Sequence, residues 1–248
     1  MVLPTEKTKP DINLYNYHWL IYGQPKIGKS SFAAMIEDAL FIPTEPGLEA
    51  LSVYKATPKE NISSWGEFLN ICRDIDDAVT KGTFKFKIVV IDTADLLLKY
   101  CSDHVCKKYN MQHPSDEGYG KGWSLLNDEF KRTLLHLSSL VKIMFISHAT
   151  DKEISTRTMK ITKTCPTLSG QAGQFIVDMP SIIGYVTTDV EDTDKRVIHF
   201  RGHESLVAGD RTQRLDPIMD FDFEAIKAKF SEPKKVKKKS ENKGGEKV

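Results

Sequence analysis

Short apolar runs alternate along the chain with segments that have a helical pattern. The runs are rich in β-branched and aromatic residues and end at Gly, Pro, Asp or other polar residues, which is typical of β-strands. They occupy residues 17–22, 39–43, 86–92, 141–147, 182–190 and 195–201. The run at 86–92 is apolar enough to be buried on both faces, as in a parallel sheet under helices. The pattern therefore predicts a sheet that is largely parallel.

Four segments between these runs are predicted to be helical: 29–39, 64–80, 94–109 and one that begins near Trp123. The spacing of apolar residues by three and four is clearest in 64–80, where Ser63 or Ser64 is a suitable N-cap. A turn-rich segment separates the last two strands and predicts an antiparallel hairpin. The expected fold class is thus α/β, with a mixed, mostly parallel sheet flanked by helices and a C-terminal antiparallel hairpin.

Two polar segments interrupt this pattern. Residues 110–122 are rich in Gly and polar residues, and residues 149–173 form a second stretch without a clear apolar period. The second is too long to be a simple connector in a compact domain, so we expect it to be functional or disordered.

Length and charge predict one domain with a basic tail. The 248 residues suit a single core, which we place at 15–230, after an extension at 1–14. The net charge is +1, but residues 233–248 hold seven Lys and two Glu, a net of +5, so the rest sums to −4. We expect 231–248 to be a disordered basic tail, and global charge gives no support for nucleic-acid binding. Four cysteines without CxxC spacing and no apolar run of membrane length predict a cytoplasmic protein without a membrane partner.

A glycine-rich loop follows the first predicted strand and opens the first predicted helix. It fits G-x-x-x-x-G-K-S, in which backbone N–H groups surround phosphate oxygens, a lysine meets the β and γ phosphates, and a hydroxyl binds the metal. The loop predicts binding of ATP and Mg²⁺; a plain glycine turn is the alternative. The predicted nucleotide-binding residues are Gly23, Gln24, Pro25, Lys26, Ile27, Gly28, Lys29, Ser30 and Ser31.

A carboxylate ends the predicted strand at 86–92. Asp92 is expected to hold magnesium together with Ser30, although it would alternatively cap the next helix. AAA+ motors usually carry a second acid directly after this position, where Thr93 stands, which argues against them. The nucleotide-recognition motif of GTPases is missing, so any general base must come from elsewhere. Glu45, after the strand at 39–43, is a candidate base, with an exposed loop carboxylate as the alternative reading.

The order of these motifs resembles the RecA-like ATPase core, and the local sequences at 42–47, 119–123, 145–148 and 208–211 resemble short phage-encoded RecA-like recombinases. The resemblance covers about residues 15–215. It implies that Lys29 contacts phosphates, that Glu45 is the catalytic carboxylate and that His148 senses the γ-phosphate. RecA itself has Gln at the position of His148, so the coupling between nucleotide and DNA is expected to differ in detail.

The resemblance also implies two DNA-binding loops, at 110–122 and 149–173, and a basic residue acting from a neighbouring subunit. Tyr119 or Trp123 would offer a stacking face, unless Trp123 belongs to the helix core. The basic candidates for DNA are Lys121, Lys152, Arg157, Lys160 and Lys163, and those for the neighbouring site are Arg201 and Arg211.

The expected function is that of a DNA-stimulated ATPase which binds single-stranded DNA and promotes annealing or strand exchange. It would work as a homo-oligomeric filament or ring, with ATP between subunits and a single-strand-binding protein as a further partner. Two alternatives stay open: a hexameric motor or loader of the replicative-helicase type, and a nucleotide-switched scaffold that does not bind DNA.

Overall fold

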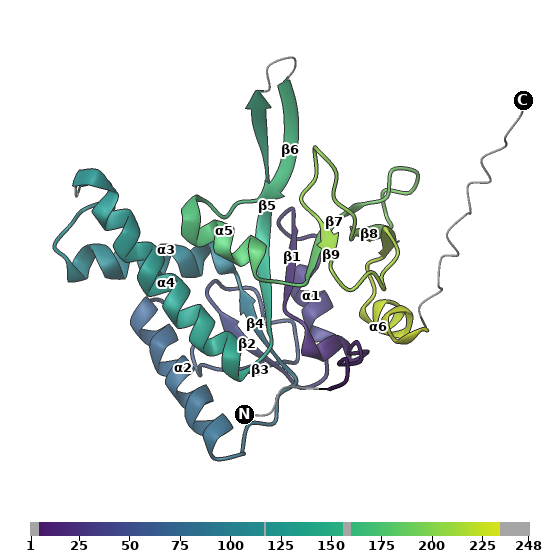
Figure 1. Cartoon of the computed structure of the whole chain (residues 1–248), viewed down its shortest axis with the longest axis horizontal. Coiled ribbons are helices and arrows are strands. Elements are labelled where there is room, and N and C mark those ends of the chain that lie inside the picture. The colour runs from purple at the N-terminus through teal and green to yellow at the C-terminus, as the bar shows by residue number, and fades with distance from the viewer. Residues whose placement is uncertain (1–4, 117, 156–159, 234–248) are drawn as a thin grey trace, which may run out of the picture.

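The structure is a computed structural model and describes residues 5–116, 118–155 and 160–233. A twisted sheet forms the centre of the molecule, and one two-stranded arm projects from it (Figure 1). Most of the predicted tail, along with Arg157, lies outside the described residues.

The sheet is parallel in its middle and antiparallel at one side, which confirms the predicted class. Its strand order is β10-β8-β7-β1-β5-β4-β2-β3. Neighbours from β7 to β3 run parallel, whereas β8 and β10 add antiparallel strands, β9 pairs antiparallel with β7 and β6 pairs antiparallel with β5. The strands are β1 Trp19–Gly23, β2 Ala39–Pro43, β3 Tyr54–Lys55, β4 Ile88–Asp92, β5 Ile143–Ser155, β6 Lys160–Pro166, β7 Ile182–Thr188, β8 Arg196–His199, β9 Gly209–Asp210 and β10 Ile218–Asp220.

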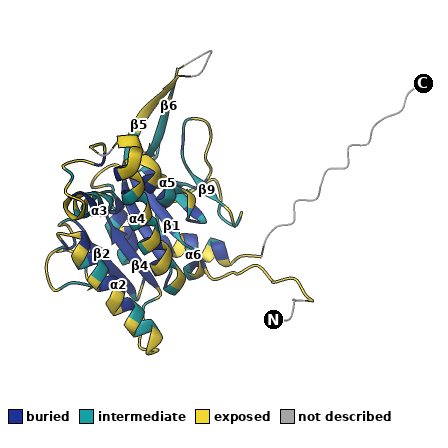
Figure 2. Cartoon of the chain, turned by 60° about the vertical axis from the view of Figure 1, so that its left-hand side comes forward, coloured by how far each residue is buried: buried dark blue, intermediate teal, exposed yellow. Residues whose placement is uncertain are grey.

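Helices cover both faces of the sheet. The α-helices are α1 Lys29–Ala34, α2 Trp65–Thr80, α3 Ala94–Lys108, α4 Lys121–Leu140, α5 Gly170–Asp178 and α6 Phe223–Ser231, with short 3₁₀ turns η1 Leu14–Asn16 and η2 Gly118–Gly120. Alternate residues of each central strand point to opposite faces. Leu20, Ile91 and Phe145 pack with α2 to α5, whereas Ile21 and Val90 pack with α1 and α6. The central strands are therefore buried on both sides (Figure 2).

Two expectations about the elements need correction. Helix α1 ends at Ala34, not residue 39, because the chain turns through Asp38, at φ 60°, to enter β2. The polar segment 149–173 is mostly regular structure: β5 continues past His148 to Ser155 and pairs with β6 to form the projecting arm. Side chains of a strand point alternately to its two faces, and both faces of this arm are largely exposed or half-buried. The arm strands therefore contain no continuous apolar run by which they could be predicted.

Candidate functional site

The glycine loop lies at the carboxyl end of β1 and leads into α1, as predicted. Gly23 packs so tightly on β7 that a Cβ there would lie 2.6 Å from the Val186 carbonyl oxygen. Gly28 has φ +98°, in the left-handed region that favours glycine. Both glycines are therefore needed for the loop to close over the end of the sheet.

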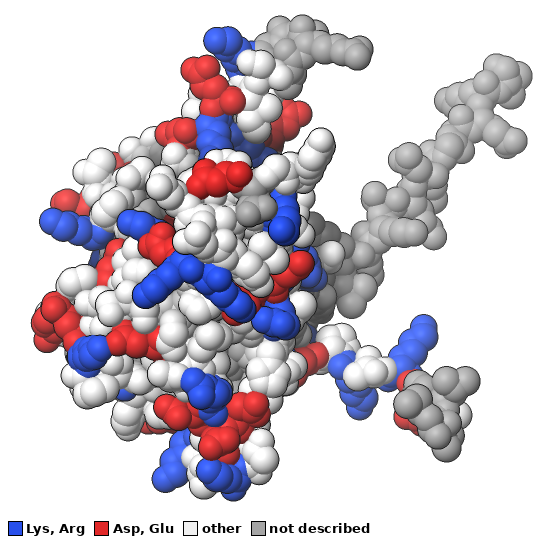
Figure 3. All heavy atoms as spheres, turned by 90° about the vertical axis from the view of Figure 1, so that its left-hand side faces the viewer, with Lys and Arg blue, Asp and Glu red and all other residues white. Residues whose placement is uncertain are grey.

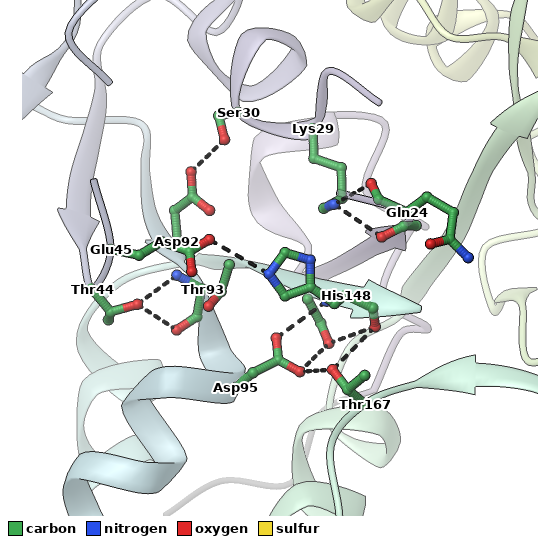
Figure 4. A network of polar contacts seen from close by, with 12 residues as sticks. Gln24, Lys29, Ser30, Thr44, Glu45, Asp92, Thr93, Asp95, His148 and Thr167 are labelled. Carbon is green, nitrogen blue, oxygen red and sulfur yellow. Dashed lines mark hydrogen bonds and ion pairs between the residues drawn. The ribbon is translucent and has the colours of Figure 1, made fainter. Parts of the chain in front are cut away.

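Lys29 is 6% exposed, and its ammonium group lies inside the loop. Its Nζ donates to the carbonyl oxygens of Gly23, at 3.0 Å, and Gln24, at 2.9 Å (Figure 4). Burial lowers the pKa of Lys29, and the negative charge of Asp92 acts in the opposite direction. An ammonium held by neutral carbonyls in a buried site is well suited to interact with an anion.

Ser30 and Asp92 meet from α1 and β4. Ser30 Oγ donates to Asp92 Oδ2 at 2.6 Å (Figure 4). Burial raises the pKa of Asp92, while the hydrogen bond from Ser30 lowers it. A hydroxyl and a buried carboxylate side by side are oxygen ligands of the kind that Mg²⁺ prefers, so the residues fit a magnesium site.

Thr44, directly after β2, forms hydrogen bonds with the end of β4. Its buried Oγ1 accepts from the backbone N–H of Thr93 at 2.7 Å and donates to the Thr93 carbonyl at 2.9 Å. The backbone N–H of Thr44 also donates to the Asp92 carbonyl. These bonds hold the next residue, Glu45, beside Asp92.

Glu45 and His148 approach each other across the site. His148 Nε2 lies 3.5 Å from Glu45 Oε1. The pKa of His148 is raised, chiefly by the hydrogen bond to Glu45, although burial opposes the shift. Glu45 and His148, both predicted to be catalytic, are thus in direct contact. Sequence reasoning did not anticipate this contact.

Asp95, in the first turn of α3, joins His148 to the base of the arm. Its carboxylate accepts from Ser147 Oγ at 3.0 Å, from the His148 backbone N–H at 3.2 Å and from Thr167 Oγ1 (Figure 4). Thr167 follows β6, so one carboxylate holds both strands of the arm where they leave the sheet. Sequence reasoning missed Asp95, because an acid in the first helical turn is common and gives no sign of a distant partner.

Arg196 is a second residue that sequence reasoning missed. Its Nη1 donates to the Ile27 carbonyl of the glycine loop at 3.3 Å. By contrast, Arg211 donates to the Asp178 carbonyl, at the end of α5. In the described part of the chain, neither Arg201 nor Arg211 has a hydrogen bond or ion pair to the glycine loop. The arginine at this loop within one subunit is thus Arg196.

The arm has two chemically different faces. Lys152 and Lys163 are directly opposite each other, and Ile154 and Ile161 form the next pair on the same face. Lys160 belongs to the other face, where its Nζ lies 3.7 Å from Glu153 Oε2. Only two of the predicted DNA-binding lysines therefore share a face. Like charges directly opposite each other are destabilising, so this pair is not explained by the stability of the arm.

Lys121 is the first residue of α4, and Trp123 lies two residues further along, directly after Gly122. Trp123 is 41% exposed and therefore not part of the helix core, and Tyr119 is fully exposed. Trp123, Leu98, Asn127 and Leu168 contribute to the lining of a cavity of about 230 Å³ between α3, α4 and the start of α5. On the face of the molecule that carries α2, α3 and α4, basic and acidic side chains are interspersed (Figure 3).

A family model described as an AAA domain matches residues 15–212. A SPbeta prophage-derived uncharacterized protein of Bacillus subtilis, YorG, is 24% identical over 180 residues, which is 72% of this chain. The match spans 53% of that relative, so the chain corresponds to about half of its length. Thr93, in place of a second acid after Asp92, was expected to argue against AAA+ motors. The matched family is nevertheless described as an AAA domain, so Thr93 at this position does not exclude one. No helix among the described residues is long and apolar enough to cross a membrane.

Proposed function

This chain belongs to the AAA domain family, a family of the P-loop ATPase type, and from that premise we propose that it is an ATP-dependent protein of phage DNA recombination. It would bind single-stranded DNA and promote annealing or strand exchange. The observation that supports this best is the course of β5, which passes His148 beside Glu45 and continues directly into the arm with the paired lysines. The prophage origin of one relative agrees with a phage context.

At the nucleotide site, each proposed role follows from position. Lys29 meets the β and γ phosphates in exchange for its carbonyl partners, and Ser30 and Asp92 hold Mg²⁺, which supplies positive charge at the phosphate oxygens when bound. Glu45 orients and deprotonates the attacking water. His148 is placed to report the γ-phosphate, because that group would compete for its contact with Glu45.

At the DNA surface, Lys152 and Lys163 contact phosphates and the exposed aromatic rings of Tyr119 and Trp123 stack on bases. Lys121 lies at the start of α4, close in sequence to both rings. We also propose a homo-oligomer with ATP between subunits, in which Arg201 or Arg211 completes the neighbouring site. A single-strand-binding protein is the expected further partner.

Two substitutions test the chemistry. Lys29→Ala should weaken ATP binding, whereas Glu45→Gln should bind ATP but hydrolyse it about a hundredfold more slowly, because it loses the general base. Glu49→Gln is a matched control, since Glu49 lies four residues further along the chain and its carboxylate contacts the Gly47 backbone N–H and Glu60. It should hydrolyse ATP at the wild-type rate. Normal hydrolysis by Glu45→Gln would show that the base is another group.

The DNA part is tested by ATPase assays with and without single-stranded oligonucleotides and by gel shifts with a slowly hydrolysed ATP analogue. A rate unaffected by DNA together with blank gel shifts would contradict the proposal and favour the nucleotide-switched scaffold. Unwinding of a forked duplex would instead favour the motor or loader. Negative-stain images with ATP and DNA would distinguish a filament from a ring.

A further inference from the structure

The positions of the metal and catalytic residues define the direction of a bound nucleotide. Asp92 ends β4, Glu45 follows β2 and His148 lies within β5, and these three strands all lie on one side of β1 in the sheet. A triphosphate in the loop with its γ-phosphate on that side has its α-phosphate and nucleoside directed towards the other side. That other side is formed by β7 and β8.

Arg196 begins β8 and reaches the glycine loop from this second side. Its Nη1 donates a hydrogen bond to the Ile27 carbonyl. The same nitrogen is also close to the next residue, because a Cβ on Gly28 would lie 2.3 Å from it. The guanidinium group thus lies against the backbone that surrounds the phosphates. A side chain at Gly28 would therefore have to displace the guanidinium group, in addition to straining the backbone at φ +98°.

The surroundings of Arg196 leave most of its donors available. A guanidinium has five N–H donors, and among the described residues that of Arg196 makes one hydrogen bond and no ion pair. The neighbouring Lys195 instead pairs with Asp220 at 2.7 Å. Asp189 accepts backbone N–H groups of its own turn, so the carboxylate is occupied locally.

We propose that Arg196 binds the α-phosphate of the nucleotide held by its own subunit, as a positioning residue on the nucleoside side of the site. The planar fork of a guanidinium matches two phosphate oxygens, which a lysine cannot do in the same way. This inference rests on the proposed nucleotide site but is independent of DNA binding. Arg196 differs from a residue that acts on the γ-phosphate, because ADP carries the group it recognises as well.

Affinity measurements for ATP and ADP test the assignment. Arg196→Ala should weaken both about tenfold or more, since a hydrogen bond to a charged group is lost in each complex. Lys195→Ala, one residue away, is the matched control and should bind both nucleotides like the wild type. A loss for ATP alone would place Arg196 at the γ-phosphate and overturn the proposal, as would unchanged affinity for both. If wild-type protein bound neither nucleotide, the nucleotide site itself would be refuted.

A sulfur substitution separates contact from mere support of the loop. The wild type should discriminate between ATP and one diastereomer of its α-phosphorothioate analogue, and Arg196→Ala should lose this discrimination. An arginine that only holds the Ile27 carbonyl would leave the discrimination the same in both proteins, which would overturn the proposal. Arg196→Lys keeps the positive charge without the planar fork of the guanidinium. Thermal melting of each variant identifies any that fails to fold.

Discussion

Replacing the lysines of the arm one at a time tests which face of the arm meets single-stranded DNA. Lys152 and Lys163 are opposite each other on one face, whereas Lys160 is near Glu153 on the other. Each lysine that neutralises a phosphate of single-stranded DNA contributes about 0.7 to the slope of log K against log salt. Lys152→Ala or Lys163→Ala should therefore lower the slope by about 0.7, and the double variant by about 1.4. Between 50 and 200 mM salt, the affinity of the double variant for DNA should therefore fall about sevenfold less than that of the wild type.

The assay is fluorescence anisotropy of a labelled oligothymidylate, measured at several salt concentrations with a slowly hydrolysed ATP analogue. Lys160→Ala is the matched control, because it removes one charge from the same arm. Its slope should equal that of the wild type. A loss of slope in Lys160→Ala as large as in Lys152→Ala would refute the assignment of the face, and an unchanged slope in the double variant would show that the arm does not contact DNA phosphates.

The stability of the same variants should change in the opposite direction. Replacing Lys152 or Lys163 by Ala removes the repulsion between these two like charges. Because both lie on an exposed arm, this repulsion should be at the low end of the roughly 0.2–1 kcal/mol typical of cross-strand pairs. Single replacements should thus slightly raise the free energy of unfolding while they weaken DNA binding. A drop in both would indicate that the arm had lost its structure.

Three further changes probe contacts at the site and at the opposite, amino end of the central strands. Thr44→Val should lower the free energy of unfolding by about 2–3 kcal/mol in urea melts, because it leaves the buried N–H and carbonyl of Thr93 without their partner. Burial lowers the pKa of His18 from 6.5 to about 4, and the ring accepts from the Ile143 N–H, so stability should fall by about 2 kcal/mol as the pH falls from 6.5 towards 4. A His18→Gln variant should lack that part of the pH dependence. Asp95→Asn should keep basal ATP hydrolysis but lose its stimulation by single-stranded DNA, measured as the ratio of the two rates.

The parts of the fold that were predicted correctly depend on local sequence. The strand at 88–92 is apolar on both faces because helices cover it, and Ser64 caps α2 as one of the two expected serines. The glycine loop was also found from spacing alone, since its conformation requires Gly23 and Gly28. In each case the residues that determine the structure are neighbours in the chain.

The contacts that were not predicted join residues far apart in the sequence. Arg196 is 169 residues from Ile27, and the Asp95 carboxylate meets a hydroxyl 72 residues away, at Thr167. Neither arginine nor aspartate stands in a motif, so nothing in the local sequence distinguishes them. Their roles follow from the strand order, which brings β8 to one side of the loop and the base of the arm to the other.

The course of β5 favours a link between hydrolysis and DNA binding over a scaffold that ignores DNA. The strand is buried up to Ser147, passes His148 at the site and becomes exposed from Asp151 in the arm. Asp95 binds the strand at Ser147 and His148 and binds the returning chain at Thr167. If the proposed nucleotide contact shifts His148, the hydrogen bonds of Asp95 at both strands of the arm are the ones it would disturb. Since the like-charged lysines lie on that same arm, a nucleotide-dependent movement there would change how the proposed DNA surface holds a polyanion, and the Asp95→Asn variant tests whether the two proposed activities are linked.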